Sequence, residues 1–300
     1  MKVLVAGFIT IDTIQLQMRS VTSIGGPPSY AGLICSRFGM DVRIMTKVGH
    51  DFPDDQSVWL ARNGIVLADV HRSLKKATTR FKIDNRGSSR ELTLLNRCEE
   101  ILQDQLPQAR VDASLVSPIA GEVSSSLLAE VSALSDFTFL DPQGFVRTFD
   151  GTGKVGIAQP KDRSILTKVD AVKMARDEAE ALTGKTSPTE ALERLASLGL
   201  RKGIVTQGGE SCFVLDGSRI YEVQVPKAPV VDLTGAGDIL SGATMSVYLR
   251  SRDFLRSACF GVAASSLSLQ MIALSKVDLP MSVDENAKRL YSQASPVAHV

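Results

Sequence analysis

The sequence carries almost no net charge, and this limits the partners that it can bind. Its 34 Lys and Arg residues nearly balance its 33 Asp and Glu residues, which leaves a formal net charge of +1. Proteins that bind nucleic acid carry a basic patch that attracts the phosphate backbone. Because no basic block stands out along this chain, we expect no nucleic-acid partner.

Cysteine is scarce and scattered. The four cysteines, Cys35, Cys98, Cys212 and Cys259, lie far apart and include no CxxC pair. Zinc sites and disulfide frameworks both use closely repeated cysteines. The sequence therefore predicts free thiols in a reducing compartment.

Long apolar runs are missing as well. No run approaches the ~20 residues that a membrane-spanning helix needs. The apolar stretch within residues 1–7 is also too short to be the core of a signal peptide. We expect a cytoplasmic protein with no membrane partner.

Short apolar runs alternate with amphipathic segments along most of the chain. This alternation predicts an α/β fold in which helices cover a mainly parallel sheet. The expected helices include Pro28–Phe38, Asp54–Asn63, with Trp59 facing the core, and Ala191–Leu198. The expected strands are Lys2–Gly7, Val42–Val48, Ile65–His71, Leu115–Ile119, Phe137–Leu140, Ala171–Met174, Gly203–Thr206, Cys212–Leu215 and Tyr221–Val225.

Residues 78–95 interrupt this rhythm. They alternate polar and apolar side chains around Asn85-Arg86-Gly87, a turn signal that predicts an antiparallel hairpin. Together with residues 13–23, this hairpin is expected to form a small β-lid over one edge of the sheet. We expect residues 1–300 to form a single domain that carries this lid.

The most informative string is Asp232-Leu233-Thr234-Gly235-Ala236-Gly237-Asp238, which precedes an apolar helix. Small residues at a helix start let backbone N–H groups approach an anion closely. A carboxylate beside a bound phosphate is unfavourable unless it has a chemical role, and a base that accepts a hydroxyl proton has such a role. A tight turn followed by an ordinary helix-start Asp is the alternative explanation.

This string resembles the signature of the ribokinase-like (PfkB) family of carbohydrate and nucleoside kinases. The resemblance implies an ATP-dependent phosphotransferase that uses Mg²⁺, and it leaves a monovalent cation open as a further cofactor. It assigns the anion hole to Gly235, Ala236 and Gly237, and the catalytic base to Asp238. It also points to a homodimer that pairs through its lids.

Other segments resemble the family along the whole chain. Residues 7–12 and 25–31 are similar to its first strand and its Gly-Gly motif, and 205–210 to its nucleotide-side loop. The resemblance therefore assigns acceptor binding to Asp12, Gly25, Gly26, Tyr30 and Arg147. It assigns nucleotide binding to Thr206, Gly208, Glu210 and Thr234.

Two positions depart from the family pattern. Where the Asn-x-x-Glu motif organises Mg²⁺, this chain has Ala175 in place of Asn but retains Glu178, which we expect near the metal. Tyr30 replaces the usual Asn of the Gly-Gly motif, which argues against a typical ribose acceptor. Residues 25–30, 116–122 and 140–147 are similar to archaeal inositol-kinase-like members, and this favours a neutral sugar, cyclitol or nucleoside as the acceptor. A sugar acid or sugar phosphate that pairs with Arg147 is the competing acceptor.

Two other classes of protein stay open. A ligand-binding relative with little catalysis would explain the loss of Asn at position 175, but it would not need Asp238. A nicotinamide-dependent oxidoreductase would depend on the GxGxxG string at residues 151–156. Because Pro160 follows that string at once, no long helix can begin there, and a solvent loop is the better interpretation.

Overall fold

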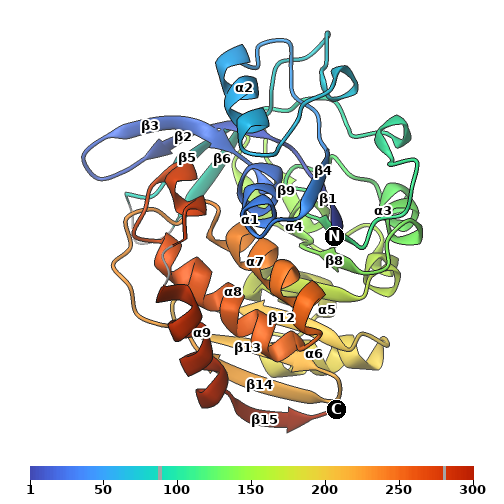
Figure 1. The fold of residues 1–300 in the computed structure, drawn as a ribbon, viewed down its shortest axis with the longest axis vertical. Coiled ribbons are helices and arrows are strands. Elements are labelled where there is room, and N and C mark those ends of the chain that lie inside the picture. The colour runs from blue at the N-terminus through green and yellow to red at the C-terminus, as the bar shows by residue number, and fades with distance from the viewer. Residues whose placement is uncertain (87–89, 280–281) are drawn as a thin grey trace.

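The computed structural model describes residues 1–86, 90–279 and 282–300. Within these residues, one sheet of nine strands forms the centre of the molecule (Figure 1). From one edge to the other its order is β15 (Ser295–His299), β14 (Arg219–Gln224), β13 (Ser211–Asp216), β12 (Lys202–Thr206), β11 (Ala171–Ala175), β8 (Thr138–Leu140), β7 (Ala113–Val116), β1 (Lys2–Ala6) and β4 (Asp41–Met45).

The ladders from β4 to β12 are parallel, and those from β12 to β15 are antiparallel. Strand β1 shows why the parallel strands are nearly all apolar. Val3 and Val5 join one buried cluster, whereas Leu4 and Ala6 join the cluster on the opposite face. Both faces of this strand are buried, as expected when helices cover both sides of a sheet.

Two sets of helices provide that cover. Residues of α1, α7, α8 and α9 belong to the first cluster, and residues of α3, α5 and α6 to the second. In Figure 1 the first set lies in front of the sheet. The helices are α1 (Leu33–Arg37), which continues a π-helical turn at Pro28–Gly32, α2 (Asp54–Arg62), α3 (Ser125–Ala133), α4 (Gln143–Val146), α5 (Arg176–Thr183), α6 (Pro188–Ser197), α7 (Ala236–Ser251), α8 (Phe254–Ser268) and α9 (Ser282–Gln293). The expected layered α/β fold is confirmed.

A second sheet lies to one side of this body, at the upper left in Figure 1. Its order is β3 (Ser20–Gly25), β2 (Thr10–Gln15), β5 (Arg80–Asp84) and β6 (Glu91–Asn96). The hairpins β2–β3 and β5–β6 are antiparallel, and β2 pairs with β5 in parallel. Gly87, the last residue of the turn signal Asn85-Arg86-Gly87, lies outside the described residues.

Three sequence predictions differ from the structure. Residues 65–71 form no strand, because only a single bridge from Val48 to Arg72 pairs this part of the chain with a neighbour. Trp59 is 36% exposed, since α2 buries only Leu60 of its residues. Residues 151–156 are not simply a loop, because β9 (Arg147–Phe149) and β10 (Val155–Ile157) pair on either side of a turn. No helix follows that turn, so the dinucleotide interpretation of the GxGxxG string is wrong.

Candidate active site

Two cavities meet beyond the carboxyl ends of the parallel strands, which is where open α/β sheets usually bind ligands. The first cavity, of about 290 Å³, includes Asp12, Tyr30 and Asp238 in its lining. The second, of about 460 Å³, lies between the β12–β13 turn and the start of α7. Both cavities are lined by Lys173, Thr206, Gly208 and Gly237. A group bound between these four residues would therefore contact both a ligand in the first cavity and a ligand in the second.

The start of α7 lies at the junction where the two cavities meet. Gly235 adopts a left-handed φ of 74° and ends the loop, and the helix begins at Ala236. A Cβ atom on Gly235 would lie 2.7 Å from the ring of Tyr30, and one on Gly237 would lie 2.8 Å from Lys173 Nζ. Gly235 is therefore required by its left-handed φ and by the Tyr30 ring, whereas a side chain at position 237 would displace the Lys173 ammonium.

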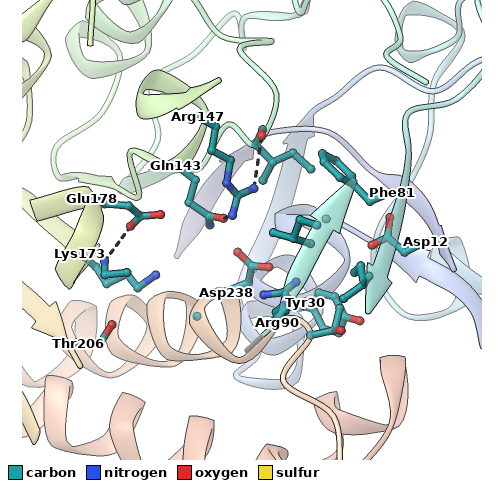
Figure 2. A pocket seen from close by; sticks show the side chains of 18 of the residues that line it. Asp12, Tyr30, Phe81, Arg90, Gln143, Arg147, Lys173, Glu178, Thr206 and Asp238 are labelled. Atoms are coloured by element: carbon teal, nitrogen blue, oxygen red, sulfur yellow. Dashed lines mark hydrogen bonds between the residues drawn. The ribbon is translucent and has the colours of Figure 1, made fainter. Parts of the chain in front are cut away.

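Asp238 lies in the first turn of α7 and points into the first cavity (Figure 2). Within the described residues, its Oδ1 is buried and has no hydrogen-bond partner. Burial, and next the nearby carboxylate of Asp141, raise the pKa of Asp238 to about 7, although Lys173 opposes this shift. A carboxylate with a pKa near neutrality and a free oxygen is well suited to accept a proton.

Lys173 supplies positive charge at the junction. It is 5% exposed in the middle of β11, and its Nζ lies 2.9 Å from Asp141 Oδ2, just after β8. Burial alone would lower the pKa of Lys173, but the carboxylates of Asp141 and Glu178 outweigh burial and raise it. The ammonium is therefore charged at neutral pH and lies beside the backbone of Gly237. Sequence analysis missed this pair, although a lysine inside an apolar strand was a signal.

Glu178 lies at the edge of the first cavity. Its Oε2 accepts the backbone N–H of Ala175 at 2.8 Å, which fixes the carboxylate at the start of α5. Burial, followed by the charge of Asp141, raises the pKa of Glu178. Among the described residues, no cluster of three or more His, Cys, Asp or Glu side chains could hold a metal ion. Mg²⁺ usually binds one or two carboxylates plus water and substrate phosphates, so a single carboxylate here is compatible with that ion.

Asp12, on β2, faces the first cavity from the side of the small sheet (Figure 2). It is 5% exposed, its Oδ1 has no partner among the described residues, and burial raises its pKa to about 6. Gly25 makes room for this carboxylate, because a Cβ there would lie 1.9 Å from Asp12 Oδ2. Gly26 lines the cavity with a φ of 85°, whereas Gly25 lies behind Asp12 and does not line it. Tyr30 also lines the cavity, and its buried hydroxyl has no partner among the described residues.

Arg147 and Gln143 approach the first cavity from α4 and the residue after it. Arg147 donates to the Gln143 side-chain oxygen and, at 3.4 Å, to the carbonyl of Ile119. Arg90 enters the same cavity from the small sheet. Sequence analysis assigned Arg147 but missed Gln143 and Arg90, because their approach to Asp12 and Asp238 depends on contacts between distant segments.

The second cavity is mostly apolar. Its wall includes Val225, Val230, Leu233, Leu240, Val262 and Leu269. Of the residues assigned to nucleotide binding, Thr206 and Gly208 line both cavities, and Thr234 lines the first. Glu210 lies in the exposed turn between β12 and β13 and lines neither cavity.

Comparison with known proteins identifies the family. Residues 6–278 match the family described as pfkB family carbohydrate kinase. The chain belongs to the pfkB family. It is therefore a kinase of the carbohydrate-kinase type, and the predicted enzyme class is confirmed.

The pfkB-family kinase has relatives with different acceptors and donors. An inositol 3-kinase from Arabidopsis thaliana is 26% identical over 293 residues, which cover 93% of this chain and 77% of that protein. A pyrophosphate-dependent kinase in the ribokinase family, solved with a pyrophosphate analog and myo-inositol, has a TM-score of 0.79 and 20% identity over 96% of this chain and 99% of its own. A fructokinase from Vibrio cholerae, solved with fructose, ADP and potassium ion, has a TM-score of 0.76 and 16% identity over 96% and 98% of the two chains. At these identities, the solved structures show that the kinase shares their fold.

No helix in the described ranges is long and apolar enough to cross a membrane.

Proposed function

We propose that this kinase transfers the terminal phosphoryl group of a nucleoside triphosphate to a hydroxyl of a neutral cyclitol such as myo-inositol. The observation that carries the proposal is Asp238, a carboxylate with a pKa of about 7 that faces the first cavity beside Gly237, where the second cavity begins. An acceptor in the first cavity and a donor in the second would meet at this carboxylate.

The proposed transfer assigns one step to each group. Asp238 takes the proton from the acceptor hydroxyl as the hydroxyl oxygen bonds to the terminal phosphorus. The bond from that phosphorus to the bridging oxygen breaks, and the nucleoside diphosphate leaves with the electron pair. Backbone N–H groups of Gly235, Ala236 and Gly237 and the ammonium of Lys173 stabilise the charge on the transferred group.

Mg²⁺, held through Glu178 and water, would neutralise the donor phosphates. The retained carboxylate supplies its protein ligand, and Ala175 offers no side-chain oxygen in place of the family Asn.

Charge balance in the first cavity favours a neutral acceptor. Its wall carries three acidic and three basic side chains, which are Asp12, Glu178, Asp238, Arg90, Arg147 and Lys173. Arg147 donates to two neutral oxygens, those of Gln143 and Ile119, which hold its guanidinium in place and leave it further N–H donors for an acceptor hydroxyl. A polyol needs several fixed polar partners, since each unpaired buried group costs about 1–3 kcal/mol. The similarity to an inositol 3-kinase supports the same choice.

The second cavity favours a nucleotide over pyrophosphate as donor. Pyrophosphate is small and polar throughout, so it would leave the apolar wall of Val225, Leu240 and Val262 uncovered. An adenine base would bury that wall, as ligands do in most preformed pockets.

We extend the proposal by resemblance and composition to a homodimer paired through the small sheet, to a cytoplasmic location and to the absence of a nucleic-acid partner.

A matrix of donors and acceptors tests the proposal. We expect product from ATP with myo-inositol, and little with ribose, a nucleoside, fructose 6-phosphate or 2-keto-3-deoxygluconate. A preference of more than about tenfold for either anionic acceptor, roughly 1.4 kcal/mol, would reject the neutral acceptor. A higher kcat/KM with pyrophosphate than with ATP would reject the nucleotide donor.

A further inference from the structure

A buried lysine holds the loop that leads into α7. Lys276 lies in the 3₁₀ helix Ala273–Val277, and its side chain is 0% exposed. Its Nζ lies 2.5 Å from the carbonyl oxygen of Asp232, 2.8 Å from that of Thr234 and 3.3 Å from Asp232 Oδ2. An ammonium group has three N–H donors, and here two of them donate to carbonyl oxygens while the charge also pairs with the Asp232 carboxylate.

These contacts act on the backbone that precedes the proposed anion hole. In a trans peptide the C=O and the following N–H point in opposite directions. The Lys276 ammonium attracts the carbonyl of Thr234, so the N–H of Gly235 is turned to the opposite side. Gly235 lines the first cavity, so its N–H, on the side away from Lys276, is directed toward that cavity. The ammonium therefore lies behind the loop and fixes how the loop faces the cavity.

The carboxylate of Asp232 has three hydrogen-bond donors besides Lys276. Its Oδ1 accepts from Asn85 Nδ2 at 3.0 Å and from the Thr234 N–H at 2.8 Å, and its Oδ2 accepts from the Ala273 N–H at 3.1 Å. A buried ammonium is costly, and lysine usually extends its head group to water instead. Burial lowers the pKa of Lys276 to about 8, although Asp232 opposes this shift. The cost is offset by a ligand set of two carbonyls and a carboxylate, and backbone carbonyls are also what bind dehydrated K⁺.

We propose that the ammonium of Lys276 is a built-in monovalent cation that positions the phosphate-binding loop, so that the kinase works without added K⁺. This inference rests on the proposed role of residues 235–237 in binding phosphate. Lys276 is a positioning residue, because it acts through the loop and lines neither of the two cavities. A free cation of similar size should be able to replace its ammonium.

Chemical rescue tests this inference. Wild-type turnover should be the same in KCl, NaCl and choline chloride at equal ionic strength. Lys276→Ala removes the ammonium and leaves space for an ion. We expect its kcat/KM for the donor to fall by about 10-fold or more in choline chloride, which is less than the about 10²- to 10³-fold cost of losing an anion-hole donor outright, because Lys276 acts through the loop. About 100 mM K⁺ or NH₄⁺ should restore most of that loss by occupying the vacated position, whereas choline is too large to enter.

Two further variants separate this effect from others. Lys276→Met fills the space with an apolar chain, so no cation should rescue it. Lys288→Ala removes an exposed lysine from α9 and should behave like the wild type in every salt. A wild-type enzyme that needs K⁺, or a Lys276→Ala variant that is fully active in choline chloride, would overturn the inference.

Thermal unfolding gives a readout that does not depend on catalysis. The Tm of Lys276→Ala should rise in KCl relative to choline chloride, and that of the wild type should not. If this shift appears but wild type shows no kinase turnover, the proposed function fails and the cation inference stands. If neither Tm nor turnover of Lys276→Ala responds to K⁺, the lysine is only a structural tie. If Lys276→Ala does not fold in any salt, the test is wild-type turnover in KCl, NaCl and choline chloride. Equal turnover in the three salts supports the inference, and a requirement for K⁺ overturns it.

Discussion

Replacing Asp238 with Asn should abolish most of the turnover and yet make the protein more stable above neutral pH. Asn keeps the size of the side chain but cannot accept the hydroxyl proton. General-base catalysis contributes about 10²- to 10⁴-fold, so kcat should fall by at least about 10². Because the wild-type pKa is about 7, its turnover should also decrease about tenfold for each pH unit below that value.

The stability effect follows from the same pKa. In the folded protein the pKa of Asp238 is about 7, whereas the ordinary pKa of an Asp side chain is 3.8. The folded state therefore binds more protons between these two values, and stability is lost as the pH rises through this window. A shift of about three units corresponds to at most about 4 kcal/mol, and partial exposure of the side chain should reduce this to about 1–3 kcal/mol. Asn carries no charge, so the variant escapes this loss.

Two measurements check this prediction. A coupled assay of nucleoside diphosphate release gives kcat, and thermal unfolding between pH 4 and pH 8.5 gives the difference in Tm. That difference should be near zero at the acid end and reach several degrees at the alkaline end. Asp55→Asn, at an exposed first-turn position of α2, should change neither quantity. Near-normal turnover, or a Tm gain that is independent of pH, would refute the reasoning.

Three more variants probe the walls of the site. Gly25→Ala should raise the acceptor KM by about 10-fold or more while leaving the donor KM unchanged, because the new Cβ would displace the Asp12 carboxylate from its place 1.9 Å away; equal changes in both KM values would contradict this. Lys173→Met should lower kcat by about 10²-fold, on the scale of one lost charge-stabilising contact, and an unchanged kcat in the folded variant would show that the phosphate binds elsewhere. Glu178→Gln should raise the Mg²⁺ concentration that gives half-maximal rate, and a metal titration that does not move would make Glu178 only a helix-start residue.

The parts of the site that could be predicted share one property, which is that their chemistry is local in sequence. The string from Asp232 to Asp238 combines the turn, the helix start and the carboxylate in seven residues. The strand at Lys2–Ala6 is equally local, because its own apolar run shows that both faces are buried. Such features require no knowledge of distant partners.

The parts that could not be predicted depend on long-range contacts. Lys173 and Asp141 are 32 residues apart, so the apolar strand around Lys173 indicates that the lysine is buried but does not identify its partner. Lys276 is more than 40 residues from the two carbonyls that it binds. The residues around it therefore do not indicate that it contacts the loop before α7. Residues 65–71 have the composition of a strand, yet they do not extend the sheet beyond its edge strand β4, and only the bridge from Val48 to Arg72 pairs this part of the chain with a neighbour.

The placement of Asp12 has a consequence for how the two substrates are aligned. Asp12 belongs to β2 of the small sheet, whereas Asp238 belongs to α7, which packs on the large one. No single rigid element fixes the distance between these carboxylates. It depends on how the small sheet is held against the loop before α7, where Asn85, just after β5, donates to Asp232. A misalignment of about 1 Å at a reacting centre can cost about 10²-fold in rate. Substitutions where the small sheet meets this loop should therefore slow phosphoryl transfer while leaving every contact to acceptor and donor chemically intact.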